Sequence, residues 1–190
     1  MLRIYIILIY ALYCLIIKSF SSKLVDHVLI KDSPIFVTYT TGNPNRIKLT
    51  INLIKSVYLH SVQLYSNTVV VCLDKSACTW CKSEALTFLP SQKSCYCIEY
   101  SSNPSESDTY ASKEWSDSVL KKIQILKEFV QTNLSYGIFS DHDVVVKSSL
   151  DDIFHQNNYN YPIITMCDFP KMYRPENKMA NTGFMLVIVK

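Results

Sequence analysis

The chain is 190 residues long, which is enough for one domain with a sizeable hydrophobic core. Hydrophobic residues make up 48% and charged residues 18%, a globular composition that excludes a largely disordered protein. The net charge is only +3 and no run of basic residues is longer than two, so nothing indicates a nucleic-acid-binding surface.

The first 21 residues are predicted to be a targeting segment. Arg3 precedes an unbroken apolar run over residues 4–17, which is short for a membrane span and suits the core of a signal peptide. Ser19 and Ser21 then supply small residues for cleavage after Ser21. The alternative is an uncleaved membrane anchor. Both interpretations route the remaining domain, residues 22–190, into the secretory pathway, either to the Golgi lumen as a type II membrane protein or out of the cell.

Six cysteines follow this segment, and an even number in an oxidising compartment predicts disulfide bonds. They are Cys72, Cys78, Cys81, Cys95, Cys97 and Cys167. The alternatives are a zinc site and unpaired buried thiols. A zinc site fits less well, because Cys95 and Cys97 are one residue too close for a zinc knuckle and no histidine is near. The pattern leaves the connectivity open. Asn133 lies in an Asn-Leu-Ser triplet that permits N-glycosylation.

After the leader, predicted strands and helices alternate. Apolar and β-branched runs predict strands, and apolar residues at helical spacing, with Asn43 and Pro44 at one start, predict helices. The strands are expected over 35–40, 68–73, 95–100, 136–140, 144–146, 161–167 and 181–189, and the helices over 44–58, 82–88, 113–132 and 148–154. Such alternation predicts an α/β fold with a mostly parallel sheet flanked by helices.

Two carboxylates, Asp141 and Asp143, come directly after one of these strands. Ligands of open α/β sheets bind at the carboxyl ends of the strands, and two neighbouring carboxylates repel each other unless they share a cation. Hard divalent ions take carboxylate oxygens and keep substrate phosphates in the same shell, so the pair predicts a clamp for a metal and a diphosphate. The alternative is a pair of strand-end aspartates that bond their own backbone.

These motifs resemble the GT-A-fold glycosyltransferases, the nucleotide-diphospho-sugar transferases. The resemblance rests on Trp115 and Lys122 in the long helix, on Phe-Ser-Asp-His-Asp-Val-Val over 139–145, on Leu-Asp-Asp-Ile-Phe over 150–154 and on Asn-Thr-Gly-Phe over 181–184. An Asp-x-Asp motif alone is weak. At a strand end, forty residues before Asn-Thr-Gly-Phe, it is moderately specific.

The resemblance implies roles for individual residues. Asp143 would coordinate Mn²⁺ or Mg²⁺ that bridges the two phosphates of a nucleotide sugar, and Asp141 would share this metal or hold the ribose and sugar. The cation would stabilise the negative charge that develops on the departing nucleoside diphosphate. Other residues are expected along the base, ribose, diphosphate and sugar of the donor. They are Thr40, Thr41, Gly42, Asp74, Lys122, Asn181 and Gly183.

The implied activity is metal-dependent transfer of a sugar from a nucleotide-diphosphate sugar, a UDP-sugar, to a glycan or glycoprotein acceptor. No catalytic residue is assigned. Family members usually continue past Asn-Thr-Gly-Phe into a portion that binds the acceptor, so we expect this GT-A-like domain to be incomplete at its C-terminal end. The alternative is a truncated, catalytically inactive relative that binds nucleotide sugar. A phosphatase with a nucleophilic aspartate fits less well, because the acidic pair comes late in the chain.

Overall fold

The structure is a computed structural model that describes residues 23–31, 33–98, 113–130, 136–150, 163–168 and 179–188. The predicted leader and Asn133 lie outside these ranges. Among the helices within them, none is both long enough and apolar enough to cross a membrane.

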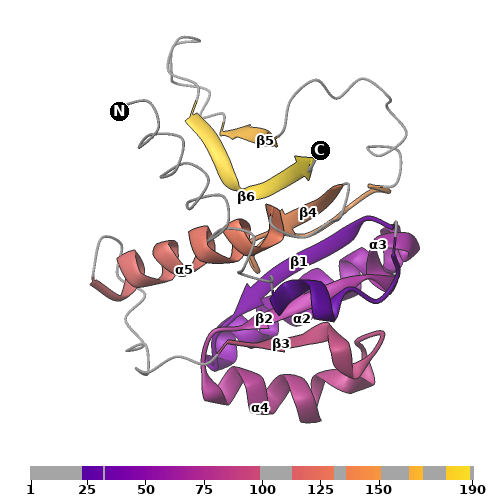
Figure 1. The fold of residues 1–190 in the computed structure, drawn as a ribbon, viewed down its shortest axis with the longest axis vertical. Coiled ribbons are helices and arrows are strands. Elements are labelled where there is room, and N and C mark those ends of the chain that lie inside the picture. Colours follow the sequence, from indigo (N-terminus) through magenta and orange to yellow (C-terminus); the bar gives the residue numbers. More distant parts are fainter. Residues whose placement is uncertain are drawn as a thin grey trace, which may run out of the picture.

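The described chain forms six strands, with helices between most of the early ones (Figure 1). The strands are β1 (Ile35–Thr40), β2 (Thr68–Cys72), β3 (Cys95–Cys97), β4 (Tyr136–Ser140), β5 (Ile163–Asp168) and β6 (Met179–Ile188). The α-helices are α2 (Pro44–His60), α3 (Val62–Ser66), α4 (Lys75–Ser83) and α5 (Lys113–Val130). The short 3₁₀ helices are η1 (Lys23–His27), η2 (Ala85–Thr87) and η3 (Gln92–Ser94).

All six strands belong to one sheet with the order β3-β2-β1-β4-β6-β5. The pairs β2–β3, β1–β2 and β1–β4 are parallel, whereas β6 runs antiparallel to both β4 and β5. The predicted α/β class with a mostly parallel sheet is therefore confirmed. The antiparallel strands are confined to one side of the sheet, beyond β4.

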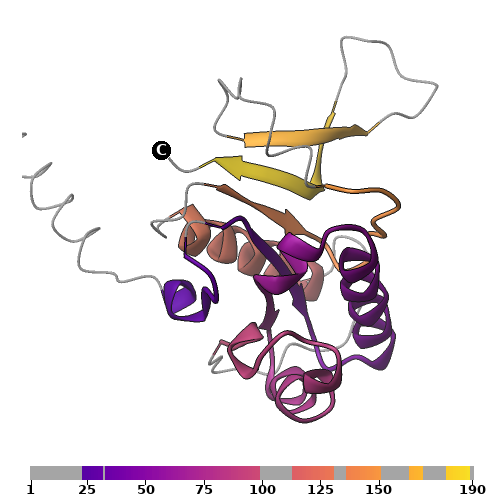
Figure 2. The same ribbon diagram turned by 90° about the vertical axis from the view of Figure 1, so that its right-hand side faces the viewer.

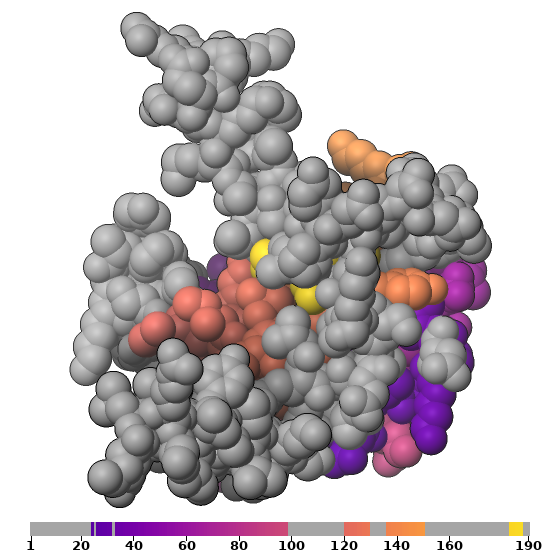
Figure 3. Space-filling view, turned by 45° about the horizontal axis from the view of Figure 1, so that its top comes forward, coloured from indigo at the N-terminus to yellow at the C-terminus, as the bar shows by residue number. Residues whose placement is uncertain are grey.

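Helices cover both faces of the parallel part of the sheet (Figure 2). On one face, Ile125 and Phe129 of α5 and Leu24 of η1 pack against β1, β2 and β4 in one core cluster. On the other face, α2, α3 and α4 pack against the same strands in two further clusters. The outer side of α5 lies at the surface beside β6 (Figure 3). This is a three-layer arrangement with the sheet between two layers of helices.

Local sequence explains the first half of the fold. All six residues of β1 are buried, as expected of a strand covered on both faces. The Asn43 side chain accepts a hydrogen bond from the backbone N–H of Asn45, and Pro44 occupies the first helical position, so α2 begins where the sequence predicts. In β4, Gly137 lies so close to Ile35 and Phe129 that a Cβ atom there would clash with both. The glycine thus permits close packing of β4 against β1 and α5.

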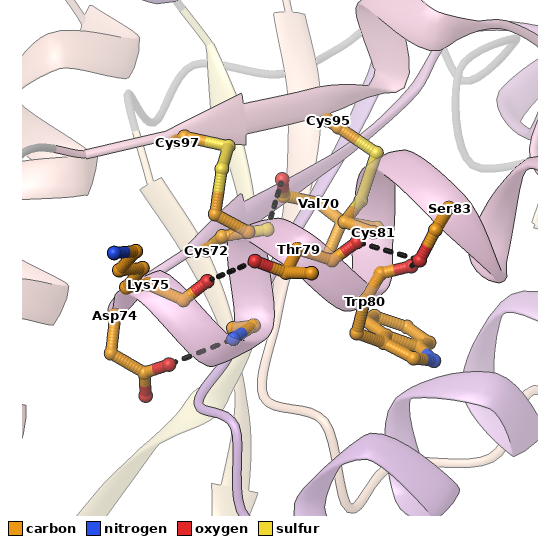
Figure 4. Close-up of a disulfide and its surroundings, with 12 residues drawn as sticks. Val70, Cys72, Asp74, Lys75, Thr79, Trp80, Cys81, Ser83, Cys95 and Cys97 are labelled. Carbon is orange, nitrogen blue, oxygen red and sulfur yellow. Dashed lines mark hydrogen bonds between the residues drawn. A yellow bond between two sulfur atoms is a disulfide. The ribbon is translucent and has the colours of Figure 1, made fainter.

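Four of the predicted cysteines form two disulfides between α4 and β3, Cys78–Cys97 and Cys81–Cys95 (Figure 4). The disulfide prediction is confirmed for these four, and the zinc alternative is excluded for them. Cys72 is a buried free thiol, and burial raises its pKa to about 12, so it stays protonated at neutral pH. The side chain of Cys167 is not among those described.

Three predicted elements differ from the structure. The helix expected over 82–88 instead spans Lys75–Ser83, because Asp74 caps its N-terminus, and it is followed by η2. The third strand is described only to Cys97. The strand expected over 144–146 does not form, because the N–H of Val146 bonds to the hydroxyl of Ser56 on α2 instead of to another strand. Residues 151–154 of the last expected helix lie outside the described residues.

Candidate functional site

Most of the predicted site residues meet at one edge of the sheet. In the parallel register, Thr40 of β1 pairs with Cys72 of β2, and Thr38 pairs with Ser140 of β4. The residues that follow these strands therefore leave the sheet side by side at its carboxyl edge. They are Thr41 and Gly42 after β1, Asp74 after β2, and Asp141 and Asp143 after β4.

The centre of this edge is an ion pair between Lys122 of α5 and Asp141. The ammonium nitrogen of Lys122 lies 2.8 Å from Oδ1 and 2.9 Å from Oδ2 of Asp141. The lysine residue is only 8% exposed, and its ammonium lies 5.5 Å from the centre of the Phe139 ring. The predicted site residue Lys122 thus points to the acidic motif, and in this state it contacts a carboxylate.

Tyr39 adds a second donor to Asp141, and pattern reasoning missed it. Its phenol donates a hydrogen bond to the Asp141 side chain from a buried position in β1. Burial raises the pKa of Tyr39, and the negative charge of Asp141 raises it further, so the phenol stays protonated. The Tyr39 ring stacks on Phe139 and meets the edge of His142, with ring centres 5.9 and 5.6 Å apart. An aromatic residue in a buried strand ordinarily signals core, so the sequence held no sign of this contact.

The backbone of Asp141 is held by the neighbouring antiparallel strand. Its N–H donates to the carbonyl of Gly183 at 2.7 Å, so the predicted site residue Gly183 lies directly beside the acidic motif. Asn181 belongs to the same strand and pairs in register with Met166, while its side chain is not among those described. Strands β4 and β6, which pair along the whole length of β4, therefore set the position of the Asp141 backbone.

Asp74 has a different kind of partner. One carboxylate oxygen accepts from the backbone N–H of Gly42 at 2.8 Å and the other accepts from the N–H of Ala77, also at 2.8 Å. A Cβ atom on Gly42 would clash with Ser76 at the start of α4, so glycine permits this close approach. Asp74 caps α4 and ties the β1–α2 loop to it. The expected roles of Asp74, Thr40, Thr41 and Gly42 at the donor stay predictions.

Asp143 and Arg46 complete the charged surroundings. Asp143 is exposed, unlike Asp141, and its charge raises the pKa of Tyr39. The positive charge of Arg46, in the first turn of α2, lowers the pKa of the same phenol. The arginine was not singled out from the sequence, because a basic residue at the start of a helix usually reads as surface. The edge therefore holds two carboxylates and two cationic side chains around one tyrosine.

The sequence comparisons agree with this geometry. Residues 63–189, about two thirds of the chain, match the family model of the nucleotide-diphospho-sugar transferases. The chain belongs to this family. As a nucleotide-diphospho-sugar transferase it is an enzyme of the glycosyltransferase class, with a nucleotide sugar as donor and a glycan as acceptor. No curated protein sequence matches the chain.

Solved structures support the fold. Mouse xyloside xylosyltransferase 1, in its apo form, superimposes with a TM-score of 0.52 over 82% of this chain and 67% of that one, at 12% sequence identity. At this low identity the likeness concerns the fold, and it confirms the predicted GT-A-like architecture. For a nucleotide-diphospho-sugar transferase, the carboxyl edge with Asp141 and Asp143 is therefore the candidate active site.

Proposed function

We propose that the chain transfers a sugar from a UDP-sugar with the help of a divalent cation, Mn²⁺ or Mg²⁺, held between Asp141, Asp143 and the donor diphosphate. The observation that carries the proposal is the junction of the acidic motif with Lys122, Tyr39 and Arg46 at the carboxyl edge of the sheet. Open α/β sheets bind their ligands at this edge.

The residues present fit a metal that is shared with the substrate. Among the described residues, no group of three or more His, Cys, Asp or Glu side chains gathers to hold an ion unaided. Two carboxylates are nevertheless a suitable set for Mg²⁺ or Mn²⁺, which keep several waters and complete their shells with substrate phosphates. When bound, the cation would stabilise the charge on the leaving nucleoside diphosphate.

The protein's own groups suit a diphosphate as well. Lys122 and Arg46 bring positive charge to the edge, and α2 begins there with its first backbone N–H groups and the positive end of its dipole. Gly183, whose carbonyl accepts from the N–H of Asp141, presents no side chain beside the acidic motif. These features support a donor site in which fixed charges surround the phosphates and the two aspartates face the metal.

The proposed setting is the secretory pathway. Two disulfides join α4 to β3, and disulfides persist in oxidising compartments. A Golgi enzyme or a secreted one both meet this condition. A glycoprotein or other glycan acceptor in the same compartment completes the proposal.

The test is ligand-dependent thermal stability of the chain from residue 22 onward. Mn²⁺ together with UDP is expected to raise the melting temperature by about 5–10 °C at a hundredfold excess over Kd, because the ligands bind only the folded state. Asp143→Ala should abolish this shift, since it removes an exposed metal ligand without disturbing the core. GDP with Mn²⁺ tests the choice of nucleotide.

Asp26→Ala is the matched control. Asp26 lies in η1, and the chain that follows it bonds through Leu29 and Ile30 to Asn67, the residue before β2, at the opposite end of the strands. This variant should keep the full shift. A shift that is independent of metal, or one that survives in Asp143→Ala, contradicts the proposed metal site. Binding of UDP and Mn²⁺ without hydrolysis or transfer of any UDP-sugar would instead favour the inactive relative.

A further inference from the structure

We propose that Lys122 is a built-in counter-ion that a metal must displace from Asp141, so that the protein takes up Mn²⁺ together with the nucleoside diphosphate and not before it. The inference rests on the proposed donor site and concerns the order in which that site is filled. It follows from the ion pair and its surroundings, and it is a property of this chain's own residues.

The first observation is that the lysine engages both oxygens of the carboxylate. The ammonium of Lys122 lies 2.8 and 2.9 Å from the two oxygens of Asp141. A hard cation binds a carboxylate through these same oxygens. Metal and ammonium therefore compete for Asp141, and a dication next to a fixed positive charge is repelled by it.

The second observation is that neither partner can turn away easily. The Asp141 backbone is tied to Gly183, and its side chain also accepts from the phenol of Tyr39. Lys122 has a side chain that is only 11% exposed, and its ammonium lies close to the Phe139 ring. A buried ammonium that lost this carboxylate would lose a directly bonded opposite charge, which is costly.

A nucleoside diphosphate resolves this competition. Its phosphates supply oxygen ligands to the metal. At the same time their negative charge can replace Asp141 as the ion-pair partner of Lys122. The ammonium then moves from the carboxylate toward the diphosphate, and no covalent bond forms or breaks. Asp143, which is exposed, offers the first contact for the arriving metal. The free protein consequently holds metal weakly, whereas the protein with its diphosphate holds it well.

The experiment measures Mn²⁺ binding directly, by the loss of the electron paramagnetic resonance signal of free Mn²⁺ on titration with the full chain. Wild type should bind Mn²⁺ weakly alone and about tenfold or more tightly with UDP present. Lys122→Gln frees the carboxylate and should bind Mn²⁺ alone about tenfold more tightly than wild type. Its gain on addition of UDP should shrink accordingly.

Lys127→Gln is the matched control, because Lys127 is an exposed lysine on the same helix. It has the same change in net charge and should behave as wild type. If Lys122→Gln and Lys127→Gln bind Mn²⁺ alone equally well, any gain in Mn²⁺ affinity comes from the lower net charge, and the counter-ion role of Lys122 is wrong.

The outcomes separate this inference from the proposed function. Tight binding of Mn²⁺ to the wild-type chain without nucleotide overturns the counter-ion role, while UDP-dependent stabilisation lost in Asp143→Ala would still support the transferase site. Absence of any Mn²⁺ binding with UDP or GDP overturns both. The wild-type titration needs no variant, so it decides the matter even if Lys122→Gln does not fold.

Discussion

Two aspartates follow the parallel strands β2 and β4, which lie on either side of β1, and they have different partners. Asp74, after β2, binds the backbone N–H groups of Gly42 and Ala77. Asp141, after β4, binds the side chains of Lys122 and Tyr39. Backbone partners cannot leave without a change of fold, whereas side-chain partners can move. The comparison shows that the partners of a strand-end aspartate indicate its role better than its place in the sheet does.

The elements around Asp74 are also more firmly fixed than those around Asp141. Asp74 begins α4, which two disulfides fasten to β3 (Figure 4). These bonds link cysteines 14 and 19 residues apart, and loops of this size stabilise a domain by about 3 kcal/mol each in the chain-entropy account. Asp141 lies among charges, next to β4 and β6, which pair through backbone hydrogen bonds. On the β2 side of the edge, Asp74 has a structural role with fixed backbone partners. On the β4 side, the side-chain partners of Asp141 can be replaced by a ligand.

The largest expected effect comes from removing Asp141. Asp141→Ala leaves the ammonium of Lys122 buried without its carboxylate, so we expect the free energy of unfolding to fall by about 3 kcal/mol. Urea denaturation followed by circular dichroism measures this. The double variant Asp141→Leu with Lys122→Met removes both charges and should regain more than half of the loss, because most of it comes from taking the carboxylate away from a buried ammonium.

Asp143→Ala is the internal control for this prediction. It removes the other acid of the same motif, but from an exposed position, so stability should change little while the proposed metal binding is lost. Equal destabilisation by the two alanine variants would mean that burial of the ion pair does not explain the difference between Asp141 and Asp143.

Asp74→Ala should have a smaller effect, a loss of about 2 kcal/mol. It removes the cap of α4 and the acceptor of Gly42, and capping losses are typically about 1 kcal/mol with a further contribution from the second hydrogen bond. Lys75→Ala, at the next and exposed position, is the control. Below its melting temperature the Asp74→Ala protein should still bind Mn²⁺ and UDP if the role of the carboxylate is purely structural.

This variant also decides the expectation drawn from the sequence. Asp74 was predicted to meet the uracil or ribose of the donor. If Asp74→Ala folds and binds UDP more weakly with Mn²⁺ affinity intact, the carboxylate has both roles. Unchanged UDP affinity would mean that the Asp74 carboxylate has a structural role only.

Much of the edge could be predicted from local sequence. The buried run of β1, the Asn43 cap and the acids after β4 are local signals, and alternation of strands and helices implies parallel strands whose carboxyl ends meet. For this reason the sequence alone predicts that Asp74 and Asp141 lie at one edge of the sheet. The disulfide prediction followed from the cysteine count and the predicted leader, and it is confirmed for four of the six cysteines.

Contacts between distant segments could not be predicted in this way. Which group Lys122 touches depends on how α5 packs against β4, and the pattern of the helix states only which side is apolar. The strand expected over 144–146 failed because Ser56, ninety residues away in sequence, takes the N–H of Val146. The antiparallel direction of β6 likewise depends on how it pairs with the distant strand β4, which a local pattern does not specify. Local pattern therefore predicted that these acidic residues lie at one edge of the sheet, but it did not reveal how their charges are paired.

The smallest expected effect tests the contact between Tyr39 and Asp141 through pH. Burial and the carboxylate raise the pKa of Tyr39 above its ordinary value of 10.0. Below pH 10 both the folded and the unfolded chain hold the proton, so this group's contribution is fully present. Above pH 10 the unfolded chain releases the proton and the folded chain keeps it, so stability falls by up to about 1.4 kcal/mol per pH unit.

Tyr39→Phe removes this slope and also costs about 1 kcal/mol at neutral pH, the value of one hydrogen bond to the carboxylate. Denaturation curves of wild type and variant should therefore differ at pH 8 and converge near pH 11. Tyr58→Phe, at a position that is 54% exposed, should give a curve parallel to that of wild type. Curves for Tyr39→Phe that stay parallel to that of wild type would mean that burial and Asp141 do not raise the pKa of Tyr39. The difference at pH 8 measures the contact with Asp141, and no difference there would leave Lys122 as the side chain that distinguishes Asp141 from Asp74.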